Sequence, residues 1–154
     1  MCLTVDKRFH GKTRPFYPLW AEHDMYVYKI LKKYRSGGET RYSTPYQHMV
    51  VKSGYEYYAS DFGIDTWSSN GQVSHGLHSW TKRQLAARDC SYRDGENVFV
   101  AIIPQGSRYF VGTEGDVVSE KLIMLNKRRV WPWEKSKTLM NSDTAKVYNF
   151  NWDV

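Results

Sequence analysis

Apolar and polar positions along most of this chain follow the pattern of short β-strands. Between Asn97 and Leu125, the sequence NVFVAIIPQGSRYFVGTEGDVVSEKLIML contains three apolar runs separated by the turn sequences PQGS and TEGD. Runs rich in Val, Ile, Tyr and Phe between such turns are typical of strands joined by tight connections. The same reasoning predicts a strand over residues 25–33 (MYVYKILKK) and shorter strands over residues 46–52, 56–59 and 73–80.

A single short helix is expected over about residues 82–91. Thr81 stands before it in the position of an N-cap, and Gln84 follows three residues later, so the two form a capping-box pattern. Trp80 and Leu85 occupy the two positions of a hydrophobic staple. A helix of this length needs tertiary packing to persist.

These elements fit one α+β domain over residues 1–154, made mostly of antiparallel β-sheet. Residues 1–24 lack periodicity and contain prolines, which favours an irregular N-terminal arm. The polar stretch YRSGGET, which begins at Tyr34, favours a loop. Residues 126–154 indicate a basic, aromatic connection followed by a C-terminal strand, because AKVYNFNWDV alternates aromatic and polar positions with a period of two.

Charge and composition favour an anionic partner. The formal net charge is +6, and aromatic residues make up 16% of the chain. A positive surface attracts nucleic acid, nucleotides or acidic proteins, and Tyr and Trp suit binding faces as well as cores. Two cysteines are too few for a disulfide framework and fit a reducing cytosol. No apolar run approaches the roughly eighteen residues of a membrane span, so we expect an intracellular protein.

The best candidate site lies in the strands between Asn97 and Leu125. Arg108 and Lys121 interrupt apolar strand residues, where a charge is costly unless it is paired or faces a ligand. On neighbouring strands, the two cations would hold a phosphate or carboxylate, with a pocket shaped by Tyr109, Trp80 and His78. The alternative is an ion pair of either cation with one of three acids, Glu120, Asp116 or Glu114.

A second candidate site is the basic connection near the C-terminus. Its cations would neutralise phosphates while its exposed indoles stack on bases. The alternative is that WPW covers the sheet and leaves the charges solvated. The residues of this nucleic-acid hypothesis are Lys127, Arg128, Arg129, Trp131 and Trp133.

Other chemistries find little support in the sequence. His75 and His78 are three apart, so on a strand they point to opposite faces and do not chelate one metal ion. The glycines form neither a P-loop nor a dinucleotide fingerprint, and no Ser/His/Asp motif indicates a hydrolase. We therefore expect no metal, no cofactor and no catalytic residue.

The segment VFVAIIPQGSRYFVGTEGDVVSEKLIML, together with HGLHSW, MCLTVDK and VYKILKK, resembles a family of small proteins from tailed-phage genomes. In that family the pattern includes a His stretch before a short helix, an IPxGSRYxxG hairpin and an SEKLI or SDKLI strand. The resemblance covers about residues 1–125. It implies a phage gene product that acts in the host bacterial cytoplasm, on host machinery or defence.

A second similarity is to the ADP-ribosyltransferase fold. VYKIL, HSWTKRQLAA and IIPQGS…SEKLI follow the order of the three segments that form its NAD site. Lys29 stands where the family has an arginine on the first strand, and HSW replaces its Ser-Thr-Ser stretch. Leu122 stands at the position of the catalytic glutamate, which leaves Glu120 as the only carboxylate of that motif.

Together these observations favour a non-enzymatic phage binding or inhibitor protein. Its ligand would be an anion, such as a nucleotide or a host defence signal, or else a host protein. One alternative is a divergent NAD-dependent ADP-ribosyltransferase-like enzyme that uses Glu120 and a histidine. The other is a virion or assembly component.

Overall fold

The computed structural model describes residues 3–44, 50–51, 56–59, 62–63, 71–73, 75–88 and 97–125. These residues form a mostly antiparallel β structure with two short helices, which confirms the expected α+β class. The helices are α1 (Lys7–His10) and α2 (Arg83–Ala87). The strands are β1 (Leu3–Thr4), β2 (Leu19–Trp20), β3 (Met25–Ile30), β4 (Lys32–Ser36), β5 (Glu39–Ser43), β6 (Val50–Val51), β7 (Glu56–Tyr58), β8 (Gln72–Val73), β9 (Leu77–Trp80), β10 (Val98–Ile103), β11 (Arg108–Val111), β12 (Asp116–Ser119) and β13 (Lys121–Met124).

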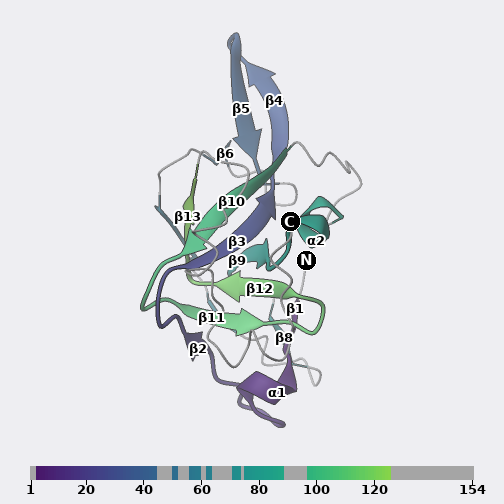
Figure 1. Ribbon diagram of the computed structural model, residues 1–154, viewed down its shortest axis with the longest axis vertical. Coiled ribbons are helices and arrows are strands. Elements are labelled where there is room, and N and C mark those ends of the chain that lie inside the picture. The colour runs from purple at the N-terminus through teal and green to yellow at the C-terminus, as the bar shows by residue number, and fades with distance from the viewer. Residues whose placement is uncertain are drawn as a thin grey trace.

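The main sheet has eight strands in the order β2-β11-β12-β9-β3-β10-β13-β7 (Figure 1). Its centre is the long antiparallel pair of β3 and β10, which runs from Val98↔Ile30 to Ile103↔Met25. The predicted strands over residues 25–33 and within the segment from Asn97 to Leu125 are thereby confirmed in kind. The last of them is divided into β12 and β13, which belong to different parts of the sheet.

Glu120 is the bend at which β12 runs into β13. Its amide donates a hydrogen bond to the Arg108 carbonyl (3.1 Å), and its carbonyl accepts one from the Ala59 amide (2.9 Å). β11 and the end of β7 lie near opposite ends of the strand order, yet both reach this one residue. The bend therefore brings two distant parts of the sheet together beside Arg108.

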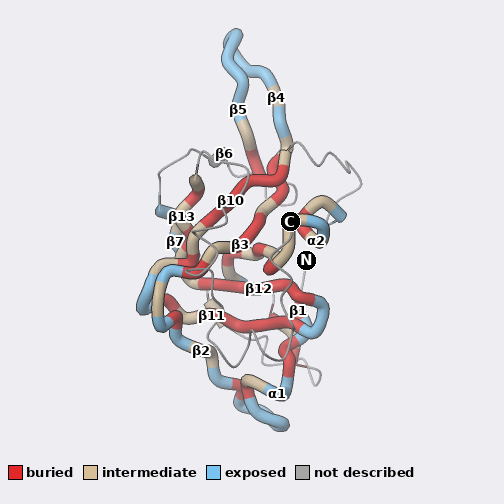
Figure 2. Tube along the Cα trace, in the orientation of Figure 1, coloured by how far each residue is buried: buried red, intermediate tan, exposed pale blue. Residues whose placement is uncertain are grey.

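The core covers both faces of the central strands, which explains their nearly continuous apolar runs (Figure 2). On one face, Val27 and Ala101 belong to the largest buried cluster, which also contains Tyr109 and Leu122. On the other face, a second cluster of β3 and β10 side chains packs against Ala86 of α2. Burial of apolar area on this scale is the main stabilising term in such a fold.

The N-terminal arm is more ordered than its sequence predicted. β1 pairs with β8, Val5 forms a bridge to Gly112, and β2 adds an edge strand beside β11. The expectation of an irregular arm over residues 1–24 was therefore wrong in part. Elements of two to four residues are too short to show a hydrophobic period, so no pattern in the sequence marked them.

The predicted helix near residue 82 exists but is shorter than expected. α2 begins after Lys82, whose side chain makes no capping hydrogen bond, so Thr81 is not the N-cap and the capping-box prediction was wrong. Thr81 is buried, and its amide donates to the Gly115 carbonyl in the β11–β12 turn region. Tertiary contact at Thr81 overrode the local capping signal. Residues 89–91 lie outside the described residues.

The polar stretch YRSGGET is the centre of a hairpin and not a loop. β4 and β5 pair from Lys32↔Ser43 to Ser36↔Glu39. Gly37 and Gly38 have φ angles of 60° and 80°, and positive φ at both central positions is typical of a type I′ turn. This hairpin extends beyond the rest of the molecule, as Figure 1 shows.

Several predictions fall outside the described residues. They include the connection and C-terminal strand of residues 126–154, and therefore the whole nucleic-acid candidate from Lys127 to Trp133. The predicted strand over residues 46–52 is described only at β6. Among the described residues, neither helix has the length and apolar character needed to cross a membrane.

Candidate functional site

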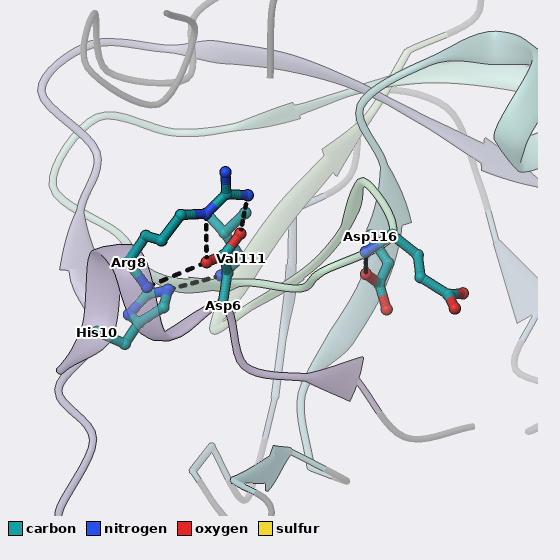
Figure 3. A network of polar contacts seen from close by, with 6 residues as sticks. Asp6, Arg8, His10, Val111 and Asp116 are labelled. Carbon is teal, nitrogen blue, oxygen red and sulfur yellow. Dashed lines mark hydrogen bonds and ion pairs between the residues drawn. The ribbon is translucent and has the colours of Figure 1, made fainter. Parts of the chain in front are cut away.

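A network of polar contacts fixes the start of the chain against β11 (Figure 3). Asp6 is the N-cap of α1 and accepts a hydrogen bond from the Arg8 amide at 3.1 Å. The Arg8 side chain returns to the same carboxylate with contacts of 3.0 and 2.6 Å. The Asp6 amide donates to the Val111 carbonyl at 2.9 Å. α1 is thereby held in register with β11.

His10 continues this network one turn later. Its Nε2 accepts a hydrogen bond from the Val111 amide at 2.9 Å, and its Nδ1 lies 2.7 Å from the Tyr17 carbonyl oxygen. Because Nε2 accepts, Nδ1 must carry the proton and donate to Tyr17. Burial lowers the pKa of His10 despite the opposing effects of the Tyr17 carbonyl and the Asp6 charge. The neutral ring thus ties both ends of the segment from His10 to Tyr17 to the sheet.

This segment closes one side of a pocket of about 490 Å³, which we call the arm pocket. Phe16 and Phe110 are buried, and the Phe62 and Phe110 rings lie 5.3 Å apart. Aromatic and proline side chains dominate the walls, and two arginines supply the charge. The lining residues are Arg14, Pro15, Phe16, Pro18, Phe62, Gly63, Arg108 and Phe110.

Several contacts hold Arg108 at the wall of the arm pocket. Its Nε and Nη2 donate to one oxygen of Glu120 at 3.0 and 2.9 Å, while its backbone amide donates to the other oxygen at 2.9 Å. The guanidinium also lies 5.2 Å from the centre of the Phe62 ring and 5.8 Å from that of Trp20. No described residue accepts a hydrogen bond from Nη1. The side chain is 40% exposed, so this nitrogen is the donor left for a ligand.

Glu120 holds Arg108 in its orientation. Partial burial raises the pKa of this carboxyl, but the hydrogen bonds from Arg108 and the charges of Arg108 and Lys121 outweigh it. The net effect is a lowered pKa, so the carboxylate stays ionised at neutral pH. The sequence-based alternative of an ion pair between Arg108 and Glu120 is therefore confirmed, at 2.9 Å.

Of the five residues proposed from the sequence, only Arg108 lines the arm pocket. Arg108 lines the arm pocket, but Lys121 does not, and its Nζ lies 5.6 Å from the centre of the Tyr58 ring. β11 and β13 are not neighbours in the sheet, so the premise that these two cations lie on adjacent strands was wrong. Tyr109 is fully buried and cannot contact a ligand at the surface.

The other two residues of that set lie on β9. His78 pairs with Val118 of β12, and Trp80 pairs with both Asp116 and Tyr28. Trp80 packs against the buried cluster between the sheet and α2. Neither lines the arm pocket, so they do not shape this pocket together with Arg108. Their strand pairing follows the central sheet, on which Arg108 is two strands away.

Sequence reasoning missed most of the arm pocket. Arg14 and Phe16 lie in the segment without periodicity, and Phe62 lies between the strands predicted over residues 56–59 and 73–80, where no element was predicted. The cluster of two aromatic residues between two prolines, PFYP from residue 15 to residue 18, was the available signal, since such side chains form apolar walls without regular structure. That signal does not reveal which residues complete the pocket, because Phe62 and Arg108 are distant from it in sequence.

The structure also describes Lys29 and Glu120, two residues of the similarity to the ADP-ribosyltransferase fold. Lys29 on β3 donates to the His78 carbonyl of β9 at 2.5 Å, so it links these two strands. Both oxygens of the Glu120 carboxylate accept hydrogen bonds from Arg108. Among the described residues, no three His, Cys, Asp or Glu side chains are grouped as a metal ion requires.

No family model, curated protein or solved structure matches this chain.

Proposed function

We propose that this chain is a non-enzymatic binding protein whose arm pocket captures an anionic ligand with a planar ring, of which a nucleotide is the simplest example. The observation that carries the proposal is the Arg108 guanidinium, fixed by Glu120 at the wall of a phenylalanine-lined pocket. The arm pocket is within the range of about 300–1,000 Å³ that is common for small-molecule sites.

The walls favour a flat, apolar ligand part. Phe16, Phe62 and Phe110 present ring carbons, and stacking or edge contacts with such rings stabilise a base or another aromatic group. Small-molecule sites typically have preformed apolar walls, and their few polar groups fix the orientation of the ligand. The ring of the ligand would therefore pack between the arm and Phe62.

The charges favour an anionic ligand part beside that ring. Within the described part of the chain no acceptor uses the Nη1 donor of Arg108, and Arg14 adds a second guanidinium to the lining. Arginine binds phosphate and carboxylate through a planar set of donors, and orientation by Glu120 reduces the entropy lost on binding. Glu120 neutralises part of the Arg108 charge, so the site favours a ligand with two or more anionic oxygens that also reaches Arg14.

Replacing Arg108 by glutamine should weaken nucleotide binding by about 10- to 100-fold, because a hydrogen bond to a charged group contributes about 1.5–3 kcal/mol. Titration calorimetry with ATP, GTP and NAD as separate probes measures the change. Lys121→Gln is the matched control, since it removes a cation of the same sheet that does not line the arm pocket. Loss of affinity in both variants alike, or no binding of any probe at millimolar concentration, would contradict the proposal.

The NAD-dependent transferase remains the alternative enzyme hypothesis, and the geometry of Glu120 speaks against it. A transferase of this kind uses its glutamate to orient the nicotinamide ribose, whereas here both carboxylate oxygens are engaged by Arg108. We therefore expect no released nicotinamide and no transferred label when the protein is incubated with labelled NAD and bacterial lysate. Release that disappears in Glu120→Gln would reverse this preference.

The resemblance to tailed-phage proteins supplies the setting of the proposal. In that setting the ligand would be a nucleotide or defence signal of the bacterial host, and binding would take place in the host bacterial cytoplasm. Affinity capture from infected cells, followed by mass spectrometry of small molecules and proteins, separates a nucleotide ligand from a host protein partner. The virion alternative is tested by mass spectrometry of purified particles.

A further inference from the structure

The β4–β5 hairpin is a two-stranded ribbon that stands apart from the main sheet (Figure 1). β6 pairs only with its base, at Tyr42 and Ser43. A Cβ atom added at Gly37 or Gly38 would meet nothing within 4 Å, so the tip is surrounded by open space. Figure 2 shows exposed residues along most of its length. The ribbon contributes little to the core. Its strand pairing and its type I′ turn hold it in shape.

The ribbon carries half of the formal net charge of the protein. Residues 32–43 contain four cations and one carboxylate, a net charge of +3 out of +6. Lys33 and Arg35 share one face, because alternate residues of a strand point the same way, and Arg41 lies opposite Tyr34 on the other face. The ion pair of Arg41 with Glu39 is long, at 3.7 Å, and both side chains are exposed. The exposed side chains of Lys33, Arg35 and Arg41 can therefore contact an external anion.

We propose that the β4–β5 hairpin docks in the major groove of double-stranded DNA. This groove is about 12 Å wide and 8.5 Å deep and admits a two-stranded ribbon. Strands of five residues extend about 17 Å, at roughly 3.4 Å per residue, so the ribbon reaches the groove floor from the surface of the domain. Cations on both faces then meet the phosphates of both groove walls.

The same geometry discriminates between possible anionic partners. The major groove of duplex RNA is too narrow and deep for protein side chains, so the ribbon would not enter it. An acidic protein would meet the charges but gives no reason for a free-standing ribbon with cations on two faces. Duplex DNA accounts for both charge and shape. This surface is separate from the arm pocket, so either proposal stands or fails without the other.

The test is a labelled DNA duplex of about two helical turns, titrated by fluorescence anisotropy at several salt concentrations between about 50 and 200 mM. The triple variant Lys33→Gln, Arg35→Gln, Arg41→Gln removes three exposed charges. Each lost phosphate contact lowers the slope of log K against log salt by about 0.9, so the slope should fall by nearly three. The affinity should drop on the order of a hundredfold.

A matched control variant removes the same charge elsewhere: Lys127→Gln, Arg128→Gln, Arg129→Gln. Equal or larger losses in this control would overturn the hairpin assignment and move DNA binding to the C-terminal connection. Equal affinity for duplex RNA or for polyglutamate would overturn docking in the groove. The conservative variant Lys33→Arg, Arg35→Lys, Arg41→Lys should keep the salt slope of the native protein, and loss of the slope there would also count against the proposal. An unchanged melting temperature in each variant establishes that the fold is intact.

Discussion

Gly76→Ala should lower the free energy of unfolding by about 3–5 kcal/mol, because overpacking and backbone strain act together at this position. Gly76 has a φ of +145°, a backbone conformation that residues with a side chain rarely adopt. A Cβ atom added there would also clash with Cγ1 of Val118. Phe62 and the Ser119 carbonyl lie 3.3 Å from the same point. The Val118 side chain of β12 and the Phe62 ring in the wall of the arm pocket would both have to move.

Gly63→Ala provides the matched control for this result. Gly63 and His75 form an isolated bridge, so Gly63 lies close to Gly76 in the fold. A Cβ atom at Gly63 would meet nothing within 4 Å, and its backbone needs no positive φ. We expect a change of less than about 1 kcal/mol, as for most substitutions without a clash. Urea denaturation followed by tryptophan fluorescence measures both variants, and equal midpoints would contradict the steric account.

The core strands of this fold could be predicted from the sequence because burial and turn chemistry point to the same answer there. β10 and β11 are apolar runs bounded by Gly- and Pro-containing turns, and β3 has the Val, Ile and Tyr content of a buried strand. The bend at Glu120 could not be predicted, since no glycine, proline or other strong turn signal marks it in the sequence VVSEKLI. Only the separate partners of β12 and β13 reveal it.

The β4–β5 hairpin shows the opposite case, because its turn carries a recognisable signal although its strands do not. YRSGGET is polar, and polarity favoured a loop. The Gly37-Gly38 pair is nevertheless a strong hairpin turn signal, because both residues can adopt the positive φ of a type I′ turn. A ribbon that is exposed on both faces shows no apolar alternation, so the turn was the only evidence for it.

The arm pocket was predictable only at Arg108. A cation inside an apolar strand demands a partner, and the sequence placed Glu120 among the candidates. The rest of the pocket depends on tertiary contacts between segments without periodicity. Arg14 comes close to Arg108 because the polar network of α1 fixes the arm on β11, and Phe62 lies beside the bridge between Gly63 and His75. No local sequence pattern predicts such a convergence. The site proposed from the sequence therefore combined Arg108 with other residues, namely Lys121, Tyr109, Trp80 and His78.

His10→Ala should destabilise the protein by about 3 kcal/mol, since it leaves the Val111 amide and the Tyr17 carbonyl without their buried partner and removes a packed ring. His10 is 2% exposed, and its ring lies 5.1 Å from that of Phe110. Detachment of the segment from His10 to Tyr17 would also open the arm pocket. Nucleotide affinity should fall together with stability in His10→Ala, whereas Arg108→Gln should lower affinity while the His10 contacts that hold the arm remain in place.

The pH dependence of stability separates the role of the His10 ring from simple packing. Burial lowers the pKa of folded His10 below the ordinary histidine value of 6.5, so below pH 6.5 the unfolded chain binds a proton that the folded chain does not. The contribution of His10 to stability is therefore complete above pH 6.5. It is lost at up to about 1.4 kcal/mol per pH unit as the pH falls toward the folded pKa. Protonation at Nε2 would also place two donors face to face at Val111.

His10→Gln, which cannot titrate, should show a shallower decline of the free energy of unfolding, measured by urea denaturation, between pH 7 and pH 5. A decline as steep as that of the native protein would mean that another group, and not His10, carries the acid sensitivity of the arm.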